Sequence, residues 1–170
     1  STGIGYDAGV CQEVLATPLK KVFNRLGLGK LIYLFIALKQ LIFISPGKLT
    51  VTLDNENTFS YDHVYFTAIM NQKYEGGGFK FCPDARPDDQ ILDVILVEGV
   101  SKIKLLFCLP TAFFGKHVGI RGIHILTGRN VHVHSESALP IHIDGESGGI
   151  REDLTVSMEK SSLKIILPVV

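Results

Sequence analysis

Hydrophobic residues in the first quarter of the chain recur about every 3.6 positions, the spacing of an amphipathic helix. The pattern predicts a helix over 8–15 and another over 30–43. Between them, Thr17 as N-cap, Pro18 at the first helical position and a stop at Gly27 predict a further helix. The chain therefore places its predicted helices mainly before residue 44.

From residue 48 onward the hydrophobic spacing changes to alternation, which is typical of strands bounded by Gly, Asn and Asp turns. The predicted strands are 49–53, 59–70, 91–97, 123–127, 131–134, 139–143, 154–158 and 163–167. One helix over 102–114, kinked at Pro110, interrupts them. Helices grouped at the front rather than interleaved favour an α+β fold, mainly an antiparallel β-sandwich, and one domain over residues 1–170.

Composition narrows the class of protein. A chain of 170 residues with 46% hydrophobic content can bury a compact core. Lys plus Arg and Asp plus Glu each number 17, so no overall field draws the domain to nucleic acid or to an anionic membrane, any such attraction must be local, and we expect no nucleic-acid partner. Three scattered cysteines indicate reduced thiols and a cytoplasmic location. The longest apolar stretch, 31–44, is too short to span a bilayer.

The segment 139–146 is the most informative one, because an alternating strand runs into a turn with two carboxylates around a glycine. Gly145 can adopt positive φ, so the chain can bend sharply and present Asp144 and Glu146 at a strand end. These carboxylates are candidates for acid–base chemistry. An Asp-Gly turn is also a strong signal for a plain hairpin, and that interpretation stays open.

Two glycine-rich segments have both functional and structural interpretations. Gly3–Ala8 fits the letters of the dinucleotide fingerprint but lacks the preceding strand and the later acidic residue, so its glycines are expected to allow close backbone approach, with Asp7 capping the next helix. The amides of Gly76, Gly77 and Gly78 could cradle a phosphate, although the segment lacks the Lys-Ser/Thr of a P-loop and also suits a turn.

Two sets of potential metal ligands also stand out. The acidic run over 84–93 is either a solvated loop or an oxygen-rich site for a hard cation such as Mg²⁺. His132 and His134 would share one strand face, as in a zinc site, but alternation with valines favours solvent-facing histidines, and His124 and His142 are expected to behave likewise.

Several of these motifs occur together in a particular order. They are Gly3–Ala8, Asn71, Gly76–Phe79, Pro83–Val94, Asp144–Glu146 and a closing strand that ends at Pro168. In that order and spacing the chain resembles the C-terminal domain of the diacylglycerol kinase-like lipid kinases, which include bacterial diacylglycerol kinases and sphingosine kinases. One departure is Gln90, where the family usually has glycine.

The resemblance implies roles for individual residues. Asp7 would accept hydrogen bonds from hydroxyls of the lipid head, as the acidic residue does in the sphingosine kinase branch. The loop after Pro83 would hold a structural Mg²⁺ through Asp89 and the backbone carbonyls of Arg86 and Ile91. ATP would be the co-substrate, bound mainly by an N-terminal domain whose Gly-Gly-Asp-Gly-Thr motif does not occur in this chain.

Phosphoryl transfer to an alcohol requires a carboxylate that takes the hydroxyl proton. Glu146 is the candidate general base, because it lies beyond the glycine where its side chain can reach a cleft, and Asp144 would orient it or organise the metal's water. We expect diacylglycerol as acceptor, an apolar pocket walled by 31–43 with Asp7 at its mouth, and no activity from this chain alone.

The expected partners are a lipid at the membrane surface, the N-terminal kinase domain of the same protein and a second copy in a homodimer. A basic set at 20, 21, 25 and 30 could contact anionic lipid or simply be solvated. Two alternatives stay open: a non-catalytic module that binds a lipid or another hydrophobic small molecule, and an NAD kinase-like domain.

Overall fold

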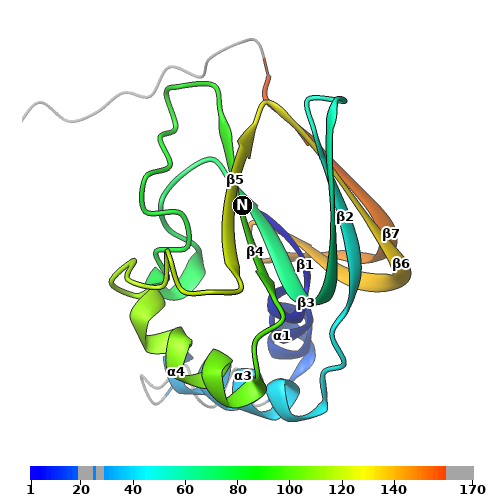
Figure 1. The fold of residues 1–170 in the computed structure, drawn as a ribbon. Helices are drawn as coiled ribbons and strands as arrows, with labels where there is room; N and C mark the ends of the chain where they lie inside the picture. Colours follow the sequence, from blue (N-terminus) through cyan, green and yellow to red (C-terminus); the bar gives the residue numbers. More distant parts are fainter. Residues whose placement is uncertain (19–24, 26–28, 160–170) are drawn as a thin grey trace, which may run out of the picture.

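The computed structural model describes residues 1–18, 25 and 29–159 of the chain, as one antiparallel sheet with helices at one end (Figure 1). The strands are β1 Thr2–Gly5, β2 Gly47–Leu53, β3 Asn57–Met70, β4 Leu92–Glu98, β5 Ile123–Gly128, β6 Asn130–Ile143 and β7 Glu146–Ser157. The helical segments are α1 Tyr6–Ala16, α3 Gly29–Phe43, the 3₁₀ turn η1 Gly76–Gly78 and α4 Lys102–Ala112. The predicted α+β class with an antiparallel sheet is confirmed.

The strand order is β1-β6-β2-β3-β4-β5, with β7 on the other side of β6. The two 14-residue strands β3 and β6 do not pair with each other. Instead β2 lies between the first halves of β3 and β6, and β1 lies between their last halves. Both β1 and β2 run antiparallel to the two long strands. The short strand β1 therefore places the start of the chain directly between two long strands.

Hydrophobic residues fill both faces of this sheet. One cluster lies between the sheet and the helices and includes Val14, Ile36 and Ile95. The second lies on the opposite face and includes Val51, Val131 and Val133. The alternation seen in the sequence thus produces two buried layers. Among the described residues, no helix is long and apolar enough to cross a bilayer.

The structure corrects several sequence expectations. Residues 2–5 form a strand that was not predicted, and α1 begins at Tyr6 with Gly5 as N-cap at φ 105°, so Asp7 is not the helix cap. The predicted strands 131–134 and 139–143 are one strand, with an irregular register between them against β7. Most of the predicted helix 17–27 and the whole strand 163–167 lie outside the described residues.

Candidate functional site

The turn between β6 and β7 consists of Asp144 and Gly145, with φ values of 46° and 85°. Positive φ at both central residues is what a two-residue hairpin of type I′ requires. The turn projects Asp144 into solvent, with its side chain 80% exposed. Glu146 follows as the first residue of β7, pairs with Ile143 and is also exposed.

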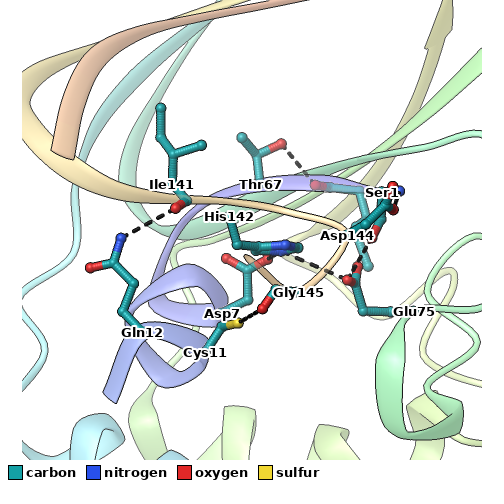
Figure 2. A network of polar contacts seen from close by, with 11 residues as sticks. Ser1, Asp7, Cys11, Gln12, Thr67, Glu75, Ile141, His142, Asp144 and Gly145 are labelled. Atoms are coloured by element: carbon teal, nitrogen blue, oxygen red, sulfur yellow. Dashed lines mark hydrogen bonds and ion pairs between the residues drawn. The ribbon is translucent and has the colours of Figure 1, made fainter. Parts of the chain in front are cut away.

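Backbone and side-chain contacts fix this turn against the rest of the domain. The Asp144 amide donates to the carbonyl of Ser1, and Asp144 Oδ1 lies 2.6 Å from the Ser1 nitrogen. From α1, Cys11 Sγ contacts the Gly145 carbonyl at 2.8 Å, and the amide of Gln12 donates to the Gly149 carbonyl at 2.9 Å. The carboxylate-bearing turn is therefore held by both β1 and α1 (Figure 2).

Next to the turn lies a largely buried cluster of three ionisable side chains, Asp7, Glu75 and His142, which we call the acid–histidine cluster (Figure 2). His142 Nε2 is 3.0 Å from Asp7 Oδ2 and 3.7 Å from Glu75 Oε1. Glu75 Oε1 also accepts a hydrogen bond from Ser1 Oγ at 2.7 Å. Residues from α1, β6 and the loop before η1 thus meet at one point.

Gly3 makes room for the acid–histidine cluster. It pairs with His142 across β1 and β6. A Cβ atom at Gly3 would overlap Asp7 Oδ2 and would lie 2.5 Å from His142 Nε2. The neighbours of Gly3 are side chains, whereas the close backbone approach that the sequence analysis expected occurs at Gly5, where a Cβ would lie 2.7 Å from the Tyr65 carbonyl oxygen.

The charges in the cluster favour its protonated forms. Burial alone would lower the pKa of His142, but the hydrogen bond with Asp7 and the charges of Asp7 and Glu75 outweigh burial and raise the pKa. Burial, and then the charge of Asp7, raises the pKa of the Glu75 carboxyl. Both groups thus hold their protons more tightly than they would in water.

Three polar atoms of the cluster are buried without a hydrogen-bond partner among the described residues: Asp7 Oδ1, Glu75 Oε2 and His142 Nδ1. Buried polar atoms are normally paired, because an unpaired one costs about 1 to 3 kcal/mol. These atoms belong to residues that meet beside the β6–β7 turn, and they leave unused hydrogen-bonding capacity for a polar ligand group such as a hydroxyl.

The predicted Mg²⁺ loop adopts a defined turn. Gln90 has φ 61°, so it takes the left-handed conformation that glycine would favour at this place. Asp89 Oδ1 accepts a hydrogen bond from the Ile91 amide at 2.9 Å, while Arg86 pairs with Asp88 at 3.3 Å. Gln90 itself therefore adopts a backbone conformation that favours glycine.

The donor set predicted for this ion fits a hard cation but is small. Over the described residues, no group of three or more His, Cys, Asp or Glu side chains is arranged to hold a metal. The predicted set, one carboxylate and two backbone carbonyls, would leave coordination sites for water, as Mg²⁺ prefers. Gly76, Gly77 and Gly78 form the single turn η1 directly after Glu75.

A groove of about 430 Å³ lies on another side of α1, between α1, the end of α3 and the sheet. Its lining includes Tyr6, Phe43, Ile44 and Leu139, but not Asp7. This groove therefore uses part of 31–43 as a wall, as in the expected pocket, but does not have Asp7 at its mouth. Asp7 points instead toward His142, because the next residue along a helix is rotated by about 100°.

The histidines differ in their environments. His132 and His134 are exposed on β6 and both contact Asp153, at 3.2 and 2.9 Å, as solvent-facing residues. His142 is 3% exposed, so the expectation that it faces solvent is wrong. Near its end β6 is covered on both faces, with Ile141 in the sheet core and His142 under α1.

Sequence reasoning missed Glu75 and His142 as site residues. Glu75 directly precedes the Gly76–Gly78 segment, and His142 lies two residues before Asp144. Only their position beside segments already singled out could have drawn attention to them.

Residues 1–167 match the family described as the YegS C-terminal NAD kinase beta sandwich-like domain, and the chain belongs to this family.

Curated relatives agree with this assignment. The chain is 31% identical over 147 residues to a Bacillus subtilis protein named lipid kinase YtlR, covering 86% of this chain and 47% of the relative. It is 28% identical over 118 residues to a Mycobacterium tuberculosis protein named diacylglycerol kinase, covering 69% and 38%. The chain thus spans less than half the length of these relatives.

Solved structures show the same fold. Two Bacillus anthracis structures described as diacylglycerol kinases align with TM-scores of 0.57 and 0.54, at 17% and 18% identity. The first alignment covers 91% of this chain and 48% of the other, and the second covers 72% and 43%.

Proposed function

We propose that this chain is the acceptor-side domain of an ATP-dependent lipid kinase that phosphorylates a lipid hydroxyl, with diacylglycerol as acceptor and phosphatidic acid as product. The observation that carries the proposal is the juxtaposition, in a chain of this family, of the carboxylate-bearing β6–β7 turn with buried polar atoms that have no hydrogen-bond partner within the described part of the chain. Relatives named as lipid or diacylglycerol kinases support the same reaction class.

In this mechanism Glu146 acts as general base and removes the proton from the acceptor hydroxyl as the phosphoryl group arrives. Its exposure leaves it accessible to an acceptor that enters from outside the domain. Asp144, fixed by its two contacts with the Ser1 backbone, orients Glu146 or the water around it.

Asp7 binds the acceptor. Its Oδ2 is held by His142, which leaves the unpartnered Oδ1 to accept a hydrogen bond from a lipid hydroxyl. A hydrogen bond to a charged acceptor contributes about 1.5 to 3 kcal/mol, enough to position one hydroxyl of a diacylglycerol.

The remaining components come from bound Mg²⁺, ATP and a second domain. Asp89, with the carbonyls of Arg86 and Ile91, would hold a Mg²⁺ that fixes the loop, and Gly76–Gly78 would offer amides to a phosphate. The N-terminal domain of the same protein would bind ATP. This chain alone is therefore expected to be inactive, and the intact enzyme would be cytoplasmic with peripheral membrane contact.

The test is phosphoryl transfer by the intact protein carrying Glu146→Gln, which keeps the size of the side chain but removes the base. Turnover should fall by about 10²-fold or more, while the far-UV spectrum and melting temperature stay unchanged. Glu152→Gln, an exposed change on the same strand β7, is the matched control and should keep wild-type turnover. Near-normal turnover in Glu146→Gln would leave the turn as a plain hairpin.

A second candidate function, a non-catalytic lipid-binding module, is favoured by the groove lined with Tyr6, Phe43, Ile44 and Leu139. It predicts binding of a fluorescent lipid without any phosphoryl transfer by the intact protein. Transfer of label from ATP to lipid would exclude it as the main function.

A further inference from the structure

Large apolar side chains are exposed on the outer sides of α3 and α4, and we call this surface the α3–α4 face. It comprises Phe35, Ile42, Phe43, Ile103, Phe107 and Phe114, and the last three, from α4 and the turn after it, are 70%, 72% and 73% exposed. The two helices lie along the same end of the domain (Figure 1). Lys102 Nζ joins them by donating to the Ile42 carbonyl at 2.6 Å.

Helix α4 contributes several exposed apolar residues to this face. In α4 the inner positions Leu105 and Cys108 are buried, yet the outer positions Ile103 and Phe107, one turn apart, are apolar as well. α4 therefore has apolar side chains on its inner and outer sides, together with Lys102 and Lys104. A contiguous exposed apolar patch of this kind marks an interaction site.

The stretches of sequence that contain α3 and α4 carry basic residues and no acidic ones, although Glu13 of α1 lies 2.6 Å from Lys39 of α3. The sequence has no Asp or Glu between Glu13 and Asp54, the stretch that contains α3, and none between Glu98 and Glu136, the stretch that contains α4. The same stretches carry lysines, among them Lys102, Lys104 and Lys116 in and after α4. An apolar and anionic partner therefore suits this surface.

We propose that the α3–α4 face docks on an anionic lipid bilayer, with its aromatic and aliphatic side chains in the headgroup–acyl boundary and its lysines on acidic headgroups. This proposal rests on the proposed function in that the acceptor is a membrane lipid. Apolar burial and about 1 kcal/mol per lysine near an anionic surface act together in such binding.

A second copy of the chain fits the face poorly. In a two-fold dimer the same patch meets itself, so Lys102, Lys104 and Lys116 would face the same lysines with no acid from either stretch to pair with them. The groove lies beside the bilayer site, because Phe43 belongs to both. A docked domain would thus hold the groove near the membrane surface.

The experiment is flotation of the intact protein with vesicles of phosphatidylglycerol and phosphatidylcholine, compared with vesicles of phosphatidylcholine alone. The wild type should float with the anionic vesicles, and added salt should weaken the binding. The double variant Ile103→Asn/Phe107→Asn should bind at least about tenfold more weakly. The matched control Ile150→Asn/Phe59→Asn replaces the same two exposed residue types on β7 and β3, and should bind like wild type.

Equal binding by the Ile103/Phe107 variant and wild type would overturn the proposal, as would a preference for neutral vesicles. A wild-type dimer that this variant converts to monomers would also overturn it in favour of self-association. Activity on a dispersed short-chain diacylglycerol separates the docking proposal from the kinase proposal, because this substrate requires no bilayer. The Ile103→Asn/Phe107→Asn variant should phosphorylate it with wild-type turnover. A wild type that floats but transfers no phosphate would sustain docking and contradict the kinase function.

Discussion

The packing of β1 against the acid–histidine cluster makes Gly3→Ala a sharp perturbation. Gly3 lies in an extended strand without positive φ, so the backbone itself tolerates alanine. The added methyl group, however, would overlap Asp7 Oδ2 and lie 2.5 Å from His142 Nε2. One of these buried side chains must move, and the hydrogen bond between them, 3.0 Å long, must lengthen or break.

The cost follows from two effects of that methyl group. Losing a hydrogen bond between charged groups costs about 1.5 to 3 kcal/mol, and overpacking a filled site costs typically 1 to 3 kcal/mol. The unfolded chain has less conformational entropy with alanine than with glycine, and this stabilises the folded variant by about 0.4 to 1 kcal/mol. We expect Gly3→Ala to lower the free energy of unfolding by about 2 to 5 kcal/mol.

Urea unfolding of the 170-residue chain, followed by circular dichroism, measures this change through the transition midpoint at constant slope. Gly47→Ala is the matched control, because a Cβ at this strand residue meets nothing within 4 Å, and it should change stability by less than about 0.5 kcal/mol. Adding Asp7→Ala to Gly3→Ala should cost less than the two single changes together. A Gly3→Ala protein as stable as the Gly47→Ala control would refute the packing of the cluster.

Three further predictions concern protons, metal and lipid. Because the pKa of His142 is raised in the folded state, its contribution to stability is complete below its unfolded pKa of about 6.5 and is lost as pH rises through the folded pKa. The stability difference between wild type and His142→Gln should therefore shrink as pH rises above about 6.5, and a constant difference would contradict the raised pKa. Millimolar Mg²⁺ should raise the melting temperature of the wild type but not of Asp89→Asn, and equal responses would remove the proposed ion. Asp7→Asn in the intact enzyme should lower kcat/KM for the lipid by about 10- to 100-fold with KM for ATP unchanged, and unchanged lipid kinetics would make Asp7 structural.

Much of the fold was predictable because its signals are local. Alternation and turn residues located β2, β3, β4 and β5, and the Asp144–Gly145 pair located the β6–β7 turn. The buried valines of β6 alternate with exposed His132 and His134, as the pattern indicated.

The features that could not be predicted from the sequence, strand β1 and the acid–histidine cluster, depend on contacts between distant segments. The four residues of β1 include two glycines and carry no periodic signal, and their strand conformation comes from pairing with β3 and β6. His142 alternates like a surface residue, but burial on both faces of β6 places it beside Asp7, 135 positions earlier in the chain. The acid–histidine cluster arises from that pairing, so no local pattern could reveal it.

The most direct test of the central claim is transfer of labelled phosphate from ATP to dispersed diacylglycerol by the intact protein in the presence of Mg²⁺. The account predicts labelled phosphatidic acid from the wild type and from Glu152→Gln, and at least about 10²-fold less from Glu146→Gln. A correctly folded wild-type protein that labels no lipid hydroxyl would contradict the proposed kinase function.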